Sequence, residues 1–489
     1  FVTENKLYET LESNNLDQEI QRAFLRAPLP LALVDELKLV LRSFQGPIAV
    51  RSSSLLEDSQ FQPFAGIYAT YMLPNNNPES EIRLSQLVSA IKHVYASAFL
   101  LLPRTYLDAI GLKIEEEKMA IVIQHLAGNL HGQNKRYYPD FSGVAQSYNF
   151  YPFTPMQPDD GIAHIAIGLG KTVVEGGNVL RFCPKYPHVL PQFVTPRSAV
   201  SLSQRDFYCL DMTNRGMPEL WKDDSITLLK QGLEIAEEDG VLGSFVSTYD
   251  PNDDLIRDGI HEGPRVARVV TFAGVLKYDL FPLAQILERL MSECSAAMGC
   301  AVEIEFAVNL KEEFIRIPIF YILQARPMVT EFDFNGIEIK KDSLSNAAFS
   351  TRALGNGITR ELTEVVIVRL DTFDNLRTRD IASEIASFND EFEKSGKKYV
   401  LVGPGRWGSN DPFLGIPVRF SDISQAKCII EIGLKDFYID PSYGSHFFSN
   451  LVSSQICYLC IPAYQTKGTS AGEDYIRWEF LEKGNLVKE

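Results

Sequence analysis

The sequence has no apolar run long enough to cross a bilayer, no recognisable signal peptide and no run rich in lysine and arginine. A membrane-spanning helix needs about 20 apolar residues, so we expect no membrane association. The formal net charge is −16, which disfavours binding to nucleic acid or to an anionic membrane surface. Any anionic ligand must therefore be held by cations gathered locally.

Cysteine is also scarce. Seven cysteines, an odd number scattered over 489 residues, indicate reduced thiols and a cytoplasmic location. Cys457 and Cys460 have CxxC spacing, but they lie in the apolar run QICYLCIP and no second pair accompanies them. This pattern favours two buried strand cysteines.

The length predicts two to four domains. Its composition, 45% hydrophobic and 22% charged, is typical of globular proteins. Pro327 and the polar run 340–346 mark a boundary, so we expect one domain over residues 1–335 and a small α/β domain over residues 345–489. The segment FVT at Phe1 has the pattern of a strand, and we interpret the chain as part of a longer one with further domains.

The stretch 302–327 predicts a hairpin of two strands. Side chains alternate along a strand, so Glu303 and Glu305 share one face, and Gln324 and Arg326 share a face of the return strand. Two carboxylates about 7 Å apart repel each other unless a cation lies between them. Oxygen donors without cysteine or histidine suit a hard ion such as Mg²⁺. A solvated hairpin face is the alternative, and these residues alone leave both interpretations open.

Two further stretches have the chemistry to contact an anion. Arg51 and the serines after it follow a short apolar strand, although a structural ion pair with Glu57 or Asp58 would explain the arginine as well. Lys171 lies in the glycine-rich turn IGLGKTVVEGG. This turn misses the phosphate-loop motif because Ile165 occupies the position of the first glycine. Its glycines permit close approach of a ligand to the backbone, and tight packing explains them nearly as well.

Taken in order, these motifs resemble the phosphoenolpyruvate synthase and pyruvate phosphate dikinase family. AVRSSSLLEDSQFQPFAG resembles the family's VRSSA-x-ED…FAG, KMAIVIQ its VVVQ strand and FSGVA its SGV. IGLGKTVVEGG resembles GLGE-x-VV-x-G, and VEIEFA…FYILQARP resembles DIEWA…YILQARP. The order and spacing hold across about residues 1–330. The whole series is far more specific than any one motif, and it favours the metal interpretation of the hairpin.

The resemblance implies an α+β fold of the ATP-grasp type, in which two lobes clamp ATP and Mg²⁺ between them. It assigns ATP phosphates to Arg51, magnesium and phosphate to Glu303, Glu305 and Gln324, and a supporting role to Arg326. Phosphoryl transfer needs cations that neutralise the charge developing on the phosphoryl oxygens, and arginine supplies a permanently charged fork.

Three more positions carry the resemblance less directly. Gln124 occupies the glutamine of the family's VVVQ strand, which implies a place near the adenine or hinge side of the cleft. Arg104 corresponds to a second phosphate-binding arginine, but it is displaced in the alignment. Lys171 replaces the usual glutamate of GLGE, which changes a charge beside the phosphates.

The second domain resembles the family's phosphohistidine swivelling domain more weakly. STRALGNGI is similar to the G-R-A-x-G start of that domain, and YGSHFFSNL to its GGxTSHAAIxAR. The resemblance implies that His446 accepts phosphate from ATP and carries it to a second site, which suits a nucleophile that titrates near neutral pH. Against it, the following Ala-Ala is replaced by Phe447 and Phe448. A structural histidine is the alternative.

The sequence therefore predicts an ATP- and Mg²⁺-dependent phosphotransferase that passes phosphate through a histidine to a small-molecule or protein acceptor. A nucleotide-binding regulatory module is the alternative, favoured by the altered motif around His446. The stretch after residue 463 is also far too short for the pyruvate-binding barrel of the family's enzymes, which needs roughly 250 residues. A pure interaction domain is a third interpretation, disfavoured by the retained Arg51, Glu303 and Glu305.

Overall fold

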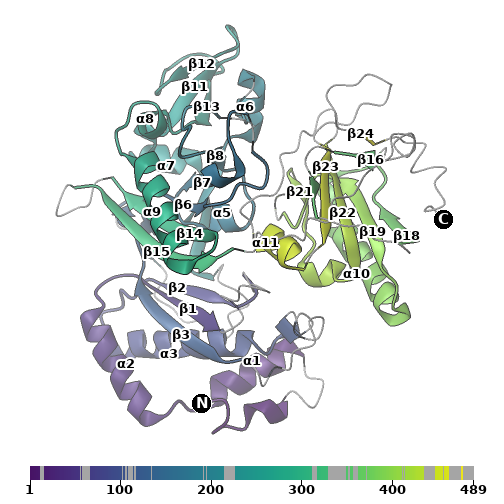
Figure 1. The fold of residues 1–489 in the computed structure, drawn as a ribbon. Coiled ribbons are helices and arrows are strands. Elements are labelled where there is room, and N and C mark those ends of the chain that lie inside the picture. The colour runs from purple at the N-terminus through teal and green to yellow at the C-terminus, as the bar shows by residue number, and fades with distance from the viewer. Residues whose placement is uncertain are drawn as a thin grey trace.

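The computed structural model forms two lobes and a separate second unit (Figure 1). The first lobe holds elements before residue 126, the second lobe those from 129 to 327, and the second unit those from 348 to 476. The structure describes residues 1–10, 16–54, 57, 66–101, 103–104, 107, 114, 117–133, 135–152, 154–190, 192–193, 195–213, 226–310, 317–328, 348–350, 353–355, 362–370, 372–409, 411, 413–433, 446–454, 456–461 and 475–476. None of the helices in these ranges has the length and apolar character that a membrane crossing requires.

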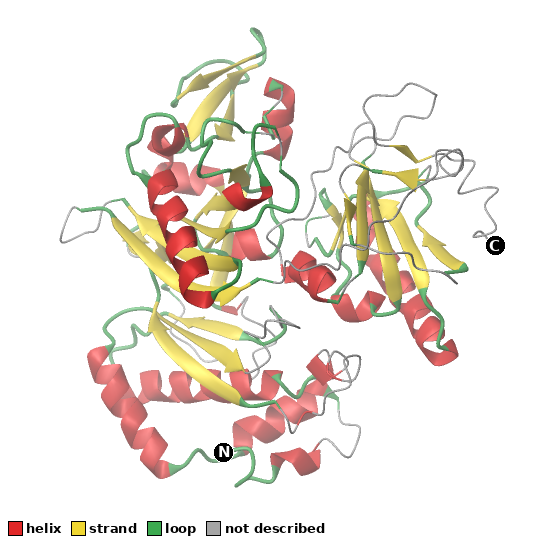
Figure 2. Ribbon diagram, viewed as in Figure 1, coloured by secondary structure: helices red, strands yellow, loops and turns green. Residues whose placement is uncertain are grey.

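The first lobe packs helices against one face of an antiparallel sheet of order β2-β1-β3, as Figure 2 shows. Leu87 and Ile91, at helical spacing on α3, are buried with Ile48 and Val50 of β1. Apolar residues recur at helical spacing within residues 1–45 and 81–102, and the helices that this spacing predicts are confirmed. The elements are η1 (Leu7–Thr10), α1 (Asp17–Arg26), α2 (Leu31–Ser43), β1 (Ile48–Ser54), β2 (Thr70–Leu73), α3 (Ser80–Ser97) and β3 (Met119–His125).

The other face of this sheet is open toward the second lobe. Residues of β3 alternate between partly buried and exposed, and Val122 is 39% exposed. The continuous apolar run KMAIVIQH, residues 118–125, predicts a fully buried strand, and this prediction was wrong. Ile121 and Ile123 pack on the lobe's core, while Gln124 lines a cleft. An apolar run by itself does not reveal whether a second layer covers the strand.

The second lobe is built on an antiparallel sheet of order β15-β14-β6-β7-β8. The predicted hairpin is confirmed: Glu303 lies opposite Arg326, and Glu305 lies opposite Gln324. A bulge between Glu305 and Phe306 shifts the register there and re-aims the side chains that follow. The strands are β6 (Phe141–Gln146), β7 (Ile162–Ile167), β8 (Leu180–Phe182), β14 (Val302–Asn309) and β15 (Ile319–Pro327).

Two smaller sheets, of orders β10-β9-β5-β4 and β12-β11-β13, complete the described part of this lobe. The sequence between 221 and 236 has the pattern of an exposed helix, but that prediction is wrong over 228–232, because Leu228 pairs with Leu210 in a strand ladder. The elements are β4 (Asn129–His131), β5 (Arg136–Tyr138), η3 (Pro158–Asp160), α5 (Lys171–Val174), α6 (Pro196–Leu202), β9 (Asp206–Asp211), β10 (Leu228–Gly232), α7 (Leu233–Glu238), η5 (Leu242–Ser244), β11 (Val246–Asp250), β12 (Leu255–Asp258), β13 (Ala267–Val270), α8 (Ala273–Leu276) and α9 (Leu283–Met298).

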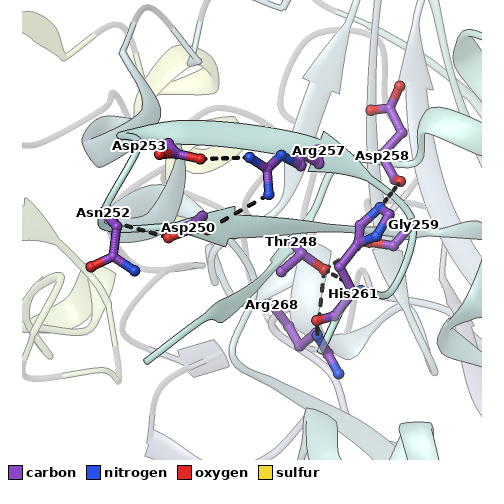
Figure 3. Close-up of polar contacts among 9 residues, drawn as sticks. All are labelled: Thr248, Asp250, Asn252, Asp253, Arg257, Asp258, Gly259, His261 and Arg268. Atoms are coloured by element: carbon purple, nitrogen blue, oxygen red, sulfur yellow. Dashed lines mark hydrogen bonds and ion pairs between the residues drawn. The ribbon is translucent and has the colours of Figure 1, made fainter. Parts of the chain in front are cut away.

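Polar contacts fasten the hairpin of β11 and β12 (Figure 3). Thr248 Oγ1 accepts the backbone N–H of His261 at 2.9 Å, and Arg268 donates to the His261 carbonyl at 3.0 Å. At the turn, Arg257 pairs with Asp253 at 2.5 Å. These charges neutralise one another within the hairpin, which marks the cluster as structural.

The second unit is an α/β body with a sheet of order β17-β23-β22-β19-β18, parallel except at the β17 edge. Its longest helix, α10, ends at Gly396 in the left-handed conformation (φ 66°), as the sequence predicts. The elements are β16 (Ala348–Phe349), β17 (Ala353–Leu354), β18 (Glu364–Ile367), η7 (Asn375–Arg377), α10 (Thr378–Ser395), β19 (Tyr399–Pro404), β20 (Arg406–Trp407), β21 (Gly415–Ile416), η8 (Phe420–Ile423), β22 (Ala426–Ile432), α11 (His446–Ser453), β23 (Cys457–Ile461) and β24 (Tyr475–Ile476).

The mixed architecture confirms the α+β and α/β fold class at this level. Cys457 and Cys460 lie on β23, which confirms that both are strand cysteines; Cys460 is buried as expected, but Cys457 is only half-buried. The strand predicted at Phe1 was wrong, because backbone hydrogen bonds such as Leu7 to Val2 fold the segment into turns. The domain boundary expected between 335 and 345 lies outside the described residues and stays a prediction.

His164 on β7 gives the second lobe a predicted pH dependence. Burial, with the charges of Arg181 and Arg406, lowers the pKa of His164 from 6.5 to about 3. At a pH between about 3 and 6.5, His164 is therefore protonated in the unfolded chain but neutral in the folded chain. The free energy of unfolding should therefore fall as the pH drops below 6.5, by about 2 kcal/mol from this residue at pH 5.

Urea unfolding of the wild type and His164→Gln at pH 7.5 and 5.0 measures this effect. The difference between the two pH values should shrink in His164→Gln and stay unchanged in His261→Gln, which alters an exposed histidine. Equal pH dependence in all three proteins would contradict the prediction.

Candidate functional site

A cleft of about 720 Å³ lies between the two lobes. This volume is within the range of small-molecule sites, roughly 300–1,000 Å³. Its walls come from the open face of β1 and β3, from the glycine-rich turn before α5 and from the β14–β15 hairpin. The residues predicted from the sequence that line it are Arg51, Gln124, Lys171, Glu305, Gln324 and Arg326.

Arg51 reaches across the cleft from the first lobe. Its Nη2 donates a hydrogen bond to Gln324 Oε1, and its Nη1 lies 3.9 Å from Glu305 Oε2. Both partners stand on the hairpin of the second lobe. The contact joins the two lobes, whereas the sequence offered partners within the loop of Arg51 itself; of these, Asp58 lies outside the described residues. Arg51 places a permanent positive charge where two oxygen-bearing side chains face the cavity.

Beneath the cleft, Glu303 and Arg326 form a buried ion pair. Arg326 Nε donates to Glu303 Oε1 at 2.8 Å and its Nη2 donates to the same oxygen, while Gln146 Nε2 donates to Oε2 at 2.7 Å. The two charged side chains are only 8% and 6% exposed. Burial opposes the charge of Arg326, but the carboxylates of Glu303 and then Glu305 raise the pKa of Arg326. The guanidinium therefore stays charged at the cleft floor.

Lys171 stands where the glycine-rich turn meets the cavity. Its Nζ pairs with Glu175 at 3.1 Å and lies 5.6 Å from the centre of the Tyr208 ring. Tyr208 in turn donates to Glu175 at 3.0 Å. Gly168 has φ 85°, and a Cβ there would lie 2.8 Å from Tyr208 O, so close packing requires this glycine. The glycines thus serve packing while the turn presents a cation to the cleft.

Gln124 and Arg104 differ in their placement. Gln124 lines the cleft at the end of β3, just before Leu126 and Ala127, which also line it and lead into the second lobe. Gln124 therefore lies next to the segment that connects the two lobes. Arg104 is half-buried beside Pro103, but it is not among the described residues that line the cavity. The structure therefore does not join Arg104 to the other predicted residues.

The donor atoms fit a magnesium ion that shares a nucleotide phosphate. Among the described residues, no group of three or more His, Cys, Asp and Glu could hold a metal by itself. Glu305 and Gln324 nevertheless present oxygens at one point beside Arg51. Glu303 is not among the described residues that line the cleft, and its oxygens accept hydrogen bonds from Arg326 and Gln146. Mg²⁺ commonly takes one or two carboxylates together with water and substrate phosphates.

The second unit also lines the cleft, which the sequence analysis did not anticipate. The residues it contributes are Gly408, Pro417, Val418, Arg419, Phe420, Phe447 and Asn450. Figure 1 shows α11 on the side of this unit that faces the two lobes. His446 is the first residue of α11, and its side chain lies outside the described part of the chain.

Comparison with known proteins agrees with this two-lobed site. Residues 3–344 match the family model of the pyruvate phosphate dikinase AMP/ATP-binding domain, and this range includes both lobes and the cleft. The chain belongs to this family. The family that the sequence motifs resemble is therefore confirmed. The property that this domain family has in common is the binding of AMP or ATP. The individual contacts with a ligand remain a matter for proposal.

One relative is a Bacillus subtilis (strain 168) protein named uncharacterized phosphotransferase YvkC. It is 30% identical over 181 residues, which make up 36% of this chain and 18% of the relative. The chain therefore corresponds to less than a fifth of that protein's length. Together with the pyruvate phosphate dikinase domain, this similarity supports a nucleotide-binding phosphotransferase family at a coarse level.

The buried pair at the cleft floor generates a prediction about stability. Glu303→Gln leaves the Arg326 charge buried without its partner and should lower the free energy of unfolding by roughly 3–5 kcal/mol. Arg326→Met should lower the free energy of unfolding by a similar amount, because it leaves the Glu303 carboxylate buried without its partner. The double variant should cost less than the sum of the two by more than about 1 kcal/mol, because it removes both charges.

Urea unfolding of the four proteins gives this double-mutant cycle. The exposed pair Arg377 and Asp380, 3.3 Å apart and each 70% exposed, serves as the control cycle. Its coupling should stay below about 1 kcal/mol. Equal coupling in the two cycles would show that burial adds nothing to the Glu303–Arg326 pair.

Proposed function

We propose that the chain is an ATP- and Mg²⁺-dependent phosphotransferase that uses the cleft to bind ATP and His446 to accept its phosphate. The observation that carries the proposal is the meeting of Arg51, Glu305 and Gln324 across the cleft. Family membership supports ATP as the nucleotide. The histidine step, the acceptor and the dikinase-like chemistry go beyond what the family gives.

The charges in the cleft suit a polyphosphate. Arg51 lies 16% exposed and Lys171 15% exposed, so both cations are partly removed from water, where their attraction for phosphate is stronger. Arg326, paired with Glu303, lies beneath these two cations. The overall charge of −16 gives no general attraction for anions, so this local group has to supply it. We assign Arg51 and Lys171 to the phosphates and Arg326 to support of the floor.

Magnesium would be held by Glu303, Glu305 and Gln324. When bound, the ion would neutralise charge that develops on the phosphoryl oxygens. Arg51 contacts Gln324 and lies near Glu305 here, so it keeps these side chains oriented toward the cavity. Gln124 and the segment after it lie at the opposite wall, where we assign the adenine end of ATP.

The group transfer would occur at an imidazole nitrogen of His446. The nitrogen forms a bond to a phosphorus atom of ATP, and the bond from that phosphorus to its bridging oxygen breaks. Attack at the γ-phosphorus releases ADP, and attack at the β-phosphorus releases AMP and leaves a pyrophosphoryl group. The phosphoryl group then passes to a small-molecule or protein acceptor. The place of α11 beside the cleft supports this assignment, because Phe447 and Asn450 of that helix line the cavity.

Label transfer tests the proposal directly. The protein is incubated with Mg²⁺ and ATP labelled at either the β or the γ position, and acid-labile, base-stable label on the protein is measured. Label is expected in the wild type and in the control His261→Ala, and it should be absent from His446→Ala. Label from the β position would indicate pyrophosphoryl transfer of the dikinase kind.

Arg51→Ala and Glu305→Gln test the role of the cleft residues in the transfer step separately from the role of His446 as phosphate acceptor. Each should reduce the rate of labelling by roughly 100-fold or more, because it removes charge that acts on the transferring group. Arg42→Ala changes an exposed arginine at the end of α2 and should have no effect. Unchanged labelling in Arg51→Ala would contradict the placement of phosphates beside β1.

The wild type could bind ATP, seen as a higher melting temperature, and still take up no label. This result would contradict the role of His446 as phosphate carrier. The bulky Phe447 and Phe448 after the histidine favour that alternative, in which the protein is a nucleotide-binding regulatory module. Wild-type protein without any response to ATP would contradict both functions.

A further inference from the structure

The second unit is attached to the second lobe through Arg406. This arginine is 8% exposed, and its Nη1 donates to the carbonyl of Gly176 at 3.0 Å. Arg406 belongs to the stretch GPGRWGS of the second unit, and Gly176 closes the turn that begins at the cleft. A charged side chain thus crosses from one body into the other and ends on a backbone oxygen.

The turn that receives Arg406 is one hydrogen-bonded piece. Gly176 N donates to Val173 O at 3.1 Å, and Gly177 N donates to Thr172 O at 2.9 Å. At its other end, Gly170 and Lys171 line the cleft. A few residues therefore separate the wall of the nucleotide cavity from the carbonyl that holds the second unit.

Arg406 is held in position by its own unit. The carboxylate of Glu431 is fully buried and accepts the N–H of Trp407 at 2.9 Å and the hydroxyl of Tyr458. Trp407 is 1% exposed and donates from its ring to the Ile430 carbonyl at 3.3 Å. These bonds fix Trp407, the residue after the arginine, and so restrict the direction in which the guanidinium is presented.

The same loop packs against α11. Gly408 has φ 80°, and a Cβ on it would lie 2.5 Å from Phe447 Cγ, so the loop and the start of α11 are in close contact. Phe448 continues the contact across the boundary, with its ring 6.2 Å from Phe150 and 6.3 Å from Tyr151 of the second lobe. Burial raises the pKa of the Tyr151 hydroxyl, which agrees with a tightly packed interface.

The second unit also reaches the first lobe. Phe420 packs with the apolar core made by Leu7, Phe24 and Phe99 of that lobe. It also packs with the core of its own unit. Val418 and Phe420 line the cleft opposite Asp17 of α1. The second unit therefore touches both walls of the cavity.

We propose that the second unit is the gate of the nucleotide cleft. Docked through Arg406 on the second lobe and Phe420 on the first, it holds the two walls together, and release of nucleotide requires it to undock. The inference rests on nucleotide binding in the proposed function, but not on phosphoryl transfer. Because coupling is reciprocal, a nucleotide that is retained by docking also stabilises docking.

Dissociation of a fluorescent ADP analogue measures the gate. The full chain is loaded with mant-ADP and Mg²⁺ and mixed with excess ADP in a stopped-flow instrument. Arg406→Ala should release the analogue roughly tenfold faster or more, the factor that follows from losing a hydrogen bond to a charged group. Phe420→Ala should accelerate release in the same direction, because it weakens the contact with the other lobe.

Matched controls lie on the same unit. Arg377→Ala removes a 70% exposed arginine, and Leu376→Ala removes a 79% exposed apolar side chain; both should release mant-ADP at the wild-type rate. Arg406→Lys keeps the charge but loses the planar fork, so an intermediate rate is expected. It replaces Arg406→Ala if that variant fails to give a cooperative melting curve.

Hydrogen exchange provides a readout of docking itself. ADP should slow exchange at residues 404–408 and in α11 of the wild type, and less so in Arg406→Ala. A wild-type release rate in either Arg406→Ala or Phe420→Ala, with exchange showing that the unit has loosened, would overturn the proposal. Faster release without any phosphoryl label on His446 would support the gate while removing the carrier. Wild-type protein that binds no mant-ADP would overturn the gate together with ATP binding.

Discussion

The Glu303–Arg326 pair buries a charged guanidinium together with the carboxylate that compensates it, beneath the floor of the cleft. The buried guanidinium is compensated by the Glu303 carboxylate, which also accepts a hydrogen bond from the Gln146 amide, and this arrangement requires β6, β14 and β15 to lie side by side in one sheet. The pair therefore fixes the hairpin register on which the neighbouring Glu305 and Gln324 depend. Those two side chains reach the cavity at the level where Arg51 arrives from the other lobe.

The cleft is made of surfaces that no single lobe completes. Arg51 belongs to a sheet whose second face is covered by none of the described helices, and the hairpin opposite supplies oxygen donors. Phe420 and Phe447 of the second unit stand at the same cavity. These apolar side chains would limit the water around a bound polyphosphate, and less water would strengthen its electrostatic contacts with the cations of the walls.

Motif and periodicity predicted much of the fold. The β14–β15 hairpin, α10 with its glycine end and the strand before the glycine-rich turn were all visible as local patterns, because alternation and capping act over a few residues. The open face of β3 was not, since an apolar run looks the same whether one side or both are covered. The helix expected over 228–232 gave way to pairing with β9, a partner that local propensity does not contain.

The sequence by itself determined the residue types of the site: carboxylates two apart on a strand, an arginine after a short apolar run and a lysine in a glycine-rich turn. Those choices follow from local chemistry. The expectation that the strand ends before Arg51 was wrong, because β1 continues to Ser54 in its ladder with β3. Only the tertiary structure decided that Arg51 contacts Gln324 of the other lobe, and that Arg406 ends on Gly176. Contacts between residues hundreds of positions apart depend on how separate sheets pack, and one sequence carries no local signal for that.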